Sequence, residues 1–284
     1  MGRISRGWQL TKQSWAIVKQ DRSLAAFPIL ATIAGLGVIA IFGGGGAALY
    51  TSTDSEPAAI VVLVIGAYVL ITVSIFCNVA VSACAARALE GHDTTVGEGF
   101  AAARSRFGVI LGWAGLQLVV GALISIIQAL LREGGGQLIA ALVGGLANFA
   151  WTVATFFVVP VIALEGLGPK DALKRSIAVI RQRWGEGVAG TFAIGGLVFL
   201  LAFLPGAALV MLGLAASGSS GALGGVLIGL GVVVFVLGAL VQTLLMAVFR
   251  VALFRFATED RVLGTYEREE LETAFQPRRQ RAAL

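Results

Sequence analysis

The chain consists of long apolar segments separated by shorter polar ones. Five apolar segments contain no Asp, Glu, Lys or Arg, namely Ser23–Thr53, Pro57–Ala86, Phe107–Leu131, Gly134–Leu164 and Gly187–Phe249. A helix needs about 20 apolar residues to cross about 30 Å of hydrocarbon. Each of the first four segments is therefore long enough for one crossing, and the fifth is long enough for two.

The fifth segment is interrupted at Ser217-Gly218-Ser219-Ser220-Gly221, which is typical of a turn. The pattern therefore predicts six transmembrane helices, at about residues 24–46, 58–86, 107–131, 137–164, 188–214 and 222–250. Long apolar runs favour helices over a β-barrel, whose strands would be short and would alternate in polarity.

The basic residues predict the orientation of these helices. All but one of the 21 Lys and Arg residues fall on one side of a six-helix arrangement, and only Arg132 falls on the other. Because short loops rich in Lys and Arg stay in the cytoplasm, we expect both termini to be cytoplasmic.

The polar segments contain an internal repeat. Ala88-Leu89-Glu90-Gly91 recurs as Ala163-Leu164-Glu165-Gly166, and residues 104–108 resemble 181–185. Residues 12–20 resemble 174–182, which gives a third copy near the N-terminus. A repeated sequence of this length indicates that one structural unit occurs three times.

An amphipathic helix is predicted at the start of each copy. Three sets of apolar residues follow a helical stripe: Leu173, Ile177, Ile180 and Trp184; Val96, Phe100, Ala103 and Phe107; and, less regularly, Trp8, Trp15 and Val18. Pro169 suits a first helical turn, and Thr95 with Glu98 fits a capping box. Basic residues flank each stripe, so we expect these helices to lie in the membrane interface.

These patterns together predict an all-α membrane protein with six transmembrane helices. The helices would form three parallel repeats, each an interfacial amphipathic helix followed by a helical hairpin. A single transmembrane domain would cover residues 1–256, with repeat units at about 1–86, 87–164 and 165–256, and residues 257–284 would form a cytoplasmic tail. The repeat fits a transporter, and it fits equally a duplication that only stabilises a bundle.

The composition agrees with a membrane protein and limits its chemistry. The chain is 57% hydrophobic and 13% charged, whereas soluble domains carry about 25% charged residues. It contains no Walker motif, HExxH, GxSxG or CxxC sequence. We therefore expect no catalytic residues, no metal and no cofactor, and the positive charge is explained by membrane topology rather than by nucleic acid.

Few polar groups remain as candidates for a functional site. No Asp, Glu, Lys or His lies near the middle of a predicted span, which argues against a carrier coupled to ions or protons. Asn78 and Asn148 lie within spans and would bond between helices or line a solute path. The other candidate functional or interfacial residues are Glu90, Arg104, Arg106, Glu165, Lys174, Arg175, Arg181, Arg183 and Trp184.

Proline and glycine residues predict local features of the spans. Pro28, Pro160 and Pro205 each remove a backbone donor and are expected to kink their helices. Gly43-Gly44-Gly45-Gly46 is expected to fray the first span. Gly225 and Gly229 have GxxxG spacing, while Gly224, Gly231 and Gly238 share one face, so either set could allow close helix packing.

Several short segments resemble one bacterial membrane family that is known only as a domain of unknown function. The similar segments are Gly2-Arg3-Ile4, Trp8 to Trp15, Phe27-Pro28, Thr155 to Pro160, Glu165 to Pro169, Leu173 to Ser176 and Trp184-Gly185-Glu186. The stretch 155–186 is the most specific. The resemblance implies a bacterial plasma membrane location and carries no known activity.

We therefore expect a non-enzymatic integral membrane protein that acts through contacts at its cytoplasmic face. Its expected partners are membrane lipids, including anionic headgroups, and a protein partner or further copies of this chain. A transporter or channel for a small neutral or lipidic solute is the alternative, favoured by the repeat and by the amides within the spans.

Overall fold

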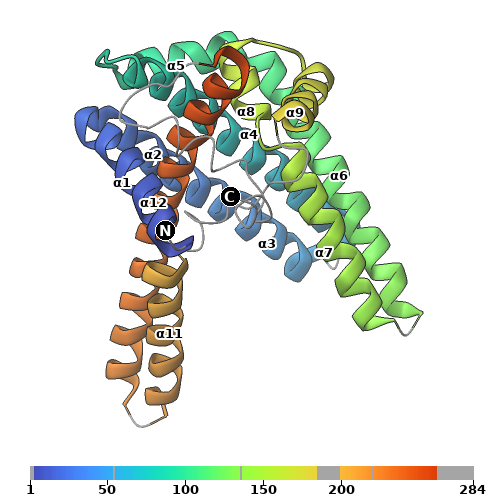
Figure 1. Cartoon of the computed structure of the whole chain (residues 1–284). Helices are drawn as coiled ribbons and strands as arrows, with labels where there is room; N and C mark the ends of the chain where they lie inside the picture. The colour runs from blue at the N-terminus through green and yellow to red at the C-terminus, as the bar shows by residue number, and fades with distance from the viewer. Residues whose placement is uncertain (1–2, 54, 135, 184–198, 219, 261–284) are drawn as a thin grey trace, which may run out of the picture. The chain divides into compact units, whose positions relative to one another are not determined.

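The computed structural model describes residues 3–53, 55–134, 136–183, 199–218 and 220–260 (Figure 1). Helices account for nearly all of these residues, and the described part of the chain contains no strand. In chain order the elements are α1 (Arg3–Gln20), the 3₁₀-helix η1 (Arg22–Ala25), α2 (Ala26–Val38), the π-helix η2 (Ile39–Gly43), α3 (Gly44–Thr53), α4 (Glu56–Leu89), α5 (Val96–Ser105), α6 (Phe107–Glu133), α7 (Gln137–Ala154), α8 (Val158–Leu164), α9 (Pro169–Arg183), the π-helix η4 (Phe199–Phe203), α11 (Leu204–Ala216) and α12 (Gly221–Glu259).

Within the described residues, five stretches of helix are long and apolar enough to cross a membrane. They are Ser23–Ser52, Glu56–Leu89, Phe107–Glu133, Gln137–Leu164 and Gly221–Glu259. They coincide with five of the six predicted spans, although the first and the last extend further than expected. The remaining predicted span, 188–214, lies partly outside the described residues, and its described part forms η4 and most of α11. A total of six spans therefore stays a prediction.

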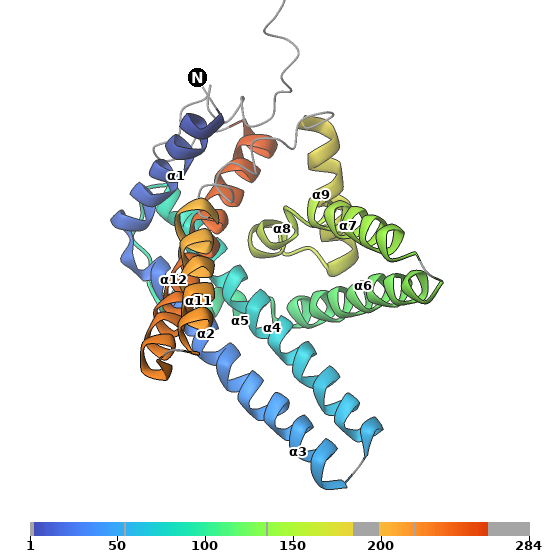
Figure 2. The ribbon, with the colours of Figure 1, turned by 90° about the horizontal axis from the view of Figure 1, so that it is seen from below.

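The chain divides into two compact units, which are described separately. One unit comprises residues 1–25, 88–93 and 183–284, and the other comprises residues 26–87 and 94–182. In the first unit α1 packs against α12, and α11 and α12 form a closely packed antiparallel hairpin (Figure 1). In the second unit α2 and α3 run beside α4, and α6 runs beside α7 (Figure 2).

Five prolines mark the beginnings of helices rather than bends within them. Pro28, Pro57, Pro160, Pro169 and Pro205 each occupy one of the first three positions of a helix, in α2, α4, α8, α9 and α11 respectively. The backbone N–H groups of a first turn have no partner within the helix, so proline costs nothing there. The kink expected at Pro160 takes the form of a turn just before α8, whereas before Pro28 and Pro205 the helix continues as a 3₁₀ turn and a π turn.

The first apolar helix continues past its glycine-rich segment, contrary to our expectation. A π-turn at Ile39–Gly43 is followed directly by α3, which extends to Thr53. Close packing against α4 explains the continuity, because Leu63 lies against Gly46, and the Phe42 side chain lies against Gly66. Gly46 therefore permits a close approach to α4, whereas Gly44 and Gly45 have open space around them.

The hairpin of α11 and α12 is held by glycines spaced seven residues apart. A Cβ atom on Gly231 would come within 2.8 Å of the carbonyl oxygen of Gly206, and one on Gly224 would come equally close to that of Gly213. Gly225 and Gly229, by contrast, have open space around the position of a Cβ. The heptad set forms the contact, and the GxxxG pair does not.

Replacing a glycine of this contact should loosen the hairpin. Gly231→Val places two methyl groups against the α11 backbone, and overpacking of this kind costs about 1–3 kcal/mol. Gly229→Val changes the helix propensity in the same way but meets no neighbour. We expect a lower thermal unfolding midpoint in detergent for Gly231→Val only, and equal midpoints for the two variants would contradict the glycine contact.

Candidate functional site

The predicted span 137–164 is interrupted near its end. α7 ends at Ala154, α8 begins at Val158, and Thr155–Phe157 form a turn between them. The Val158 N–H donates to the carbonyl of Thr155 at 3.1 Å, so it no longer reaches Ala154. Pro160 has no N–H to offer to the residue four positions earlier. The break therefore leaves backbone groups of an apolar segment in need of other partners.

Ser176 of α9 supplies two of these partners. Its hydroxyl donates to the carbonyl of Ala154 at 2.7 Å and accepts from the N–H of Phe157 at 3.1 Å. Ser176 and Phe157 are both completely buried. In hydrocarbon an unpaired backbone group costs several kcal/mol, so this single hydroxyl allows the helix to break and holds α9 against the break.

A second contact holds α9 beside the end of α8. Arg175 binds the carboxylate of Glu165 with both Nε and Nη2, at distances of 3.0–3.2 Å. Glu165 caps the C-terminus of α8, and the next residue, Gly166, has a φ of 67°. A two-pronged pair between arginine and a carboxylate fixes orientation as well as distance. Glu165 and Arg175, both predicted site residues, are therefore partners of each other.

The α8–α9 linker packs on the first turns of α6. The guanidinium group of Arg106 lies directly against Gly166, and the ring of Pro169 lies against Gly112, so that a Cβ on Gly112 would be 2.9 Å from the proline Cγ. Gly166 therefore needs to be glycine for two reasons, its positive φ and the neighbouring guanidinium.

The shorter amphipathic helix α5 is fixed by a capping box and an aromatic cluster. Thr95 and Glu98 exchange the two hydrogen bonds of the predicted capping box, which the structure confirms. Phe100 contacts Phe27 of α2 edge-on, with ring centroids 5.6 Å apart, and contacts Phe76 of α4. α5 is therefore anchored to two apolar helices of the same unit.

Glu98 also forms an ion pair with the end of α4. Nη1 of Arg87 donates to the carboxylate at 2.8 Å. The Arg87 guanidinium, together with the backbone N–H of Thr95, holds the pKa of Glu98 below its usual range. The carboxylate is therefore charged throughout the neutral range, where it stabilises both the start of α5 and the α4–α5 connection.

α1, α5 and α9 each bury a small residue at a position that the repeat predicted from the sequence would align. Ser14 in α1 and Ser176 in α9 are fully buried, and Gly99 in α5 lies against Phe27 and Cys84. The residues that follow them are large and apolar, and they are only partly covered: Trp15 is 40% exposed, and Phe100 and Ile177 are half-buried. The helices thus turn their small residues toward the protein and leave part of their large apolar residues uncovered.

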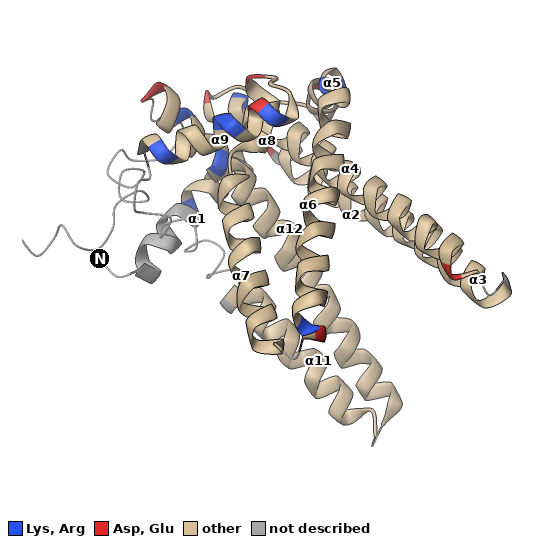
Figure 3. Cartoon of the chain, turned by 90° about the vertical axis from the view of Figure 1, so that its right-hand side faces the viewer, with Lys and Arg blue, Asp and Glu red and all other residues tan. Residues whose placement is uncertain are grey.

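Charged residues of the second unit gather at one end of its apolar helices. Figure 3 shows them around α5, α8 and α9, whereas α4, α6 and α7 are almost free of charge along their length. At the opposite end α6 closes with Arg132 and Glu133. The ends of the apolar helices therefore differ strongly in charge.

The remaining predicted site residues lie in separate places. Arg104 and Arg181 are exposed on α5 and α9, and Lys174 forms an exposed pair with Asp171 at 3.5 Å. Glu90 belongs to the other unit, where it lies 3.6 Å from Arg255. The side chain of Arg183 and the whole of Trp184 lie outside the described residues.

The amides within the apolar helices bond to their own helix. Asn78 donates to the carbonyl of Ser74 and Asn148 to that of Gly144, each at 2.8 Å. Our expectation of bonds between helices is therefore wrong for these two residues. The described bond between α4 and α6 comes instead from Tyr68, whose hydroxyl donates to the carbonyl of Leu111 at 3.1 Å.

Sequence reasoning did not single out Ser176 as a site residue. A signal was present, because Ser176 matches Ser14 in the internal repeat and lies within the most specific stretch of the family resemblance. The sequence did not show where α7 and α8 are interrupted, and the role of the Ser176 hydroxyl depends on that position. No three His, Cys, Asp or Glu side chains come together as a metal site in the part of the chain that the structure describes.

The five long apolar helices and the charge distribution at their ends are those of a membrane-embedded helical protein. The chain matches the model of a family of unknown function, DUF6159, over residues 57–264. This range covers well over half of the chain, and the protein belongs to that family. It includes the helix break, α9 and the hairpin of α11 and α12. Searches of curated proteins and of solved structures found no match.

Removing the hydroxyl of Ser176 should destabilise the protein. Ser176→Ala leaves the carbonyl of Ala154 and the N–H of Phe157 unpaired, which costs about 1–3 kcal/mol for a buried polar group. Ser105→Ala is the matched control, because Ser105 is exposed and its hydroxyl bonds only within α5. Unfolding in detergent should show a clear loss for Ser176→Ala and almost none for the control. If both variants are as stable to unfolding as the wild type, the Ser176 hydroxyl does not stabilise the break.

The pair of Glu98 and Arg87 should add a pH-dependent stability. A carboxylate whose pKa is lower in the folded state stabilises the fold above its unfolded pKa, and this contribution is lost as the pH falls through the lowered value. Wild type should therefore be more stable than Glu98→Gln at neutral pH, and the difference should shrink at a pH of about 3. Thermal midpoints at the two pH values measure this difference. Glu133→Gln, at the opposite end of α6, should show no such change.

Proposed function

We propose that this protein is a non-enzymatic integral membrane protein that acts through contacts with lipids or with a protein partner at the cytoplasmic face of a bacterial plasma membrane. One observation carries the proposal: amphipathic helices beside the apolar helices bury small residues and leave part of their large apolar residues uncovered. A surface of this kind, flanked by cations, is typical of helices that lie in a membrane interface.

Charge supports the orientation. In the second unit α5 and α9 carry Arg104, Lys174 and Arg181 on exposed positions, at the end where α4 stops and α6 starts. Anionic lipids attract cations at the membrane surface by about 1 kcal/mol each. We therefore place this end in the cytoplasm, together with both termini, and infer six crossings.

The threefold repeat is part of the proposal, and two local features support it. Gly91 and Gly166, which follow the matched Glu90 and Glu165, both have positive φ, at 85° and 67°. Each of these glycines ends an apolar helix shortly before an amphipathic one begins. A positive φ at matched glycines is what a duplicated unit would have kept.

Native mass spectrometry of the intact protein tests the proposal. Protein extracted in mild detergent should retain anionic phospholipids in excess over their share of the source membrane. Replacing Arg104, Lys174 and Arg181 with Gln should lower this excess. The expected decrease is about fivefold for each of these cations that binds an anionic headgroup. Arg132→Gln, at the opposite end of α6, is the control and should have no effect. A preparation that retained neither a protein partner nor any preferred lipid would exclude the proposal.

A transporter for a small neutral or lipidic solute is the second candidate. The break between α7 and α8 favours it, because interrupted helices bind substrates in many transporters. Here, however, Ser176 already accepts from the N–H of Phe157 and donates to the carbonyl of Ala154, so the N–H is not left for a solute. Solute flux into proteoliposomes above that of protein-free vesicles would favour the transporter.

A further inference from the structure

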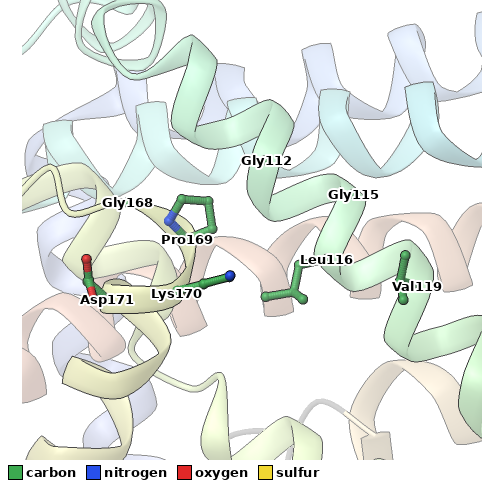
Figure 4. A pocket seen from close by; sticks show the side chains of 8 residues that line it. All are labelled: Gly112, Gly115, Leu116, Val119, Gly168, Pro169, Lys170 and Asp171. Carbon is green, nitrogen blue, oxygen red and sulfur yellow. The ribbon is translucent and has the colours of Figure 1, made fainter.

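The second unit carries an open groove between α6 and the beginning of α9. Its volume is about 510 Å³, which lies within the range of small-molecule sites. Gly112, Gly115, Leu116 and Val119 of α6 line one side, and Gly168, Pro169, Lys170 and Asp171 line the other (Figure 4). The absence of side chains at the two glycines is what hollows the surface of α6.

One end of the groove is charged. Figure 4 shows the side chain of Lys170 extending from the first turn of α9 toward Leu116, whereas Asp171 lies on the other side of Pro169. Asp171 is paired with Lys174. Lys170 is exposed and forms no ion pair with the residues that the structure describes. The ammonium group of Lys170 is therefore free to bind an anion at this end.

The other end of the groove is apolar and follows a candidate membrane span. Gly112 lies five residues after the start of α6, about 8 Å along the helix, and Val119 lies about 10 Å further. Leu116 and Val119 are incompletely covered, and Val119 is 55% exposed. The groove thus begins near the charged end of α6 and continues toward the middle of an apolar helix.

We propose that this groove binds one anionic phospholipid, with its phosphate at Lys170 and an acyl chain along Gly112, Gly115 and Val119. Charge complementarity selects the headgroup, and the apolar wall along a span selects an acyl chain. The inference rests on the proposed function, because it requires this end of α6 to lie at a membrane surface.

A second groove on the same unit provides an internal comparison. It has a volume of about 340 Å³ and lies between α3 and α4, beside Gly46, Ala59 and Leu63. Glu56 is its charged residue, and no cation lines it. It therefore offers an acyl chain a similar apolar surface but repels an anionic headgroup.

Photo-crosslinking of the full chain in nanodiscs tests the site. The probe is phosphatidylglycerol with a diazirine in one acyl chain, diluted in phosphatidylcholine, and labelled peptides are identified by mass spectrometry. We expect labelling of residues 115–119 to fall about fivefold in Lys170→Gln relative to labelling of the α3–α4 groove. Arg132→Gln, at the opposite end of α6 and outside the groove, should leave the ratio unchanged. Val119→Trp, which fills the groove and retains Lys170, should also reduce the labelling.

The outcomes separate the groove from the proposed function. Unchanged labelling in Lys170→Gln, or equal displacement of the probe by unlabelled phosphatidylcholine and phosphatidylglycerol, overturns the site. If the wild type still retains anionic lipids in native mass spectrometry, the broader proposal survives that result. If the wild type shows no lipid preference in either measurement and retains no protein partner, both proposals fail together.

Discussion

The structure depends on one constraint, which is that a backbone polar group within an apolar segment must have a partner. Long helices meet this requirement by themselves, and for this reason most of the chain consists of them. Where the apolar helix Gln137–Leu164 breaks, the requirement is met by another helix, through the hydroxyl of Ser176. The position of α9 is therefore set by the backbone of another helix, with Glu165 and Arg175 adding a second attachment at the surface.

Close helix contacts in this protein depend on missing side chains. Gly206 and Gly231 bring α11 and α12 together, and Gly46 and Gly66 do the same for α3 and α4. Apolar side chains gain little from one another in lipid, since lipid is equally apolar, and close packing of backbones becomes correspondingly more important. At the polar end of the second unit, aromatic contacts hold the helices together: Phe100 of α5 packs against Phe27 of α2 and Phe76 of α4.

The sequence predicted the elements well and their contacts poorly. Charge-free runs located five apolar helices, because the absence of charge over 20 or more residues depends only on the surrounding medium. Thr95 and Glu98 predicted a helix start, because a capping box is local. Pro160 indicated a disturbance but not the turn at Thr155–Phe157, whose form depends on a serine from a helix further along the chain. Asn78 and Asn148 were expected to bond between helices or to line a solute path, whereas the carbonyl one turn earlier in their own helix is always within reach.

The attachment of α9 has a mechanical consequence. Because one hydroxyl group joins both sides of the α7–α8 break, α9 cannot lift from the protein without exposing two backbone groups to an apolar environment. The helix at the surface and the short segment of the span beneath it are therefore expected to move as one rigid piece. Anything that tilts α9 would tilt α8 with it. The turn at Thr155–Phe157 would act as the hinge, so that α7 would keep its position.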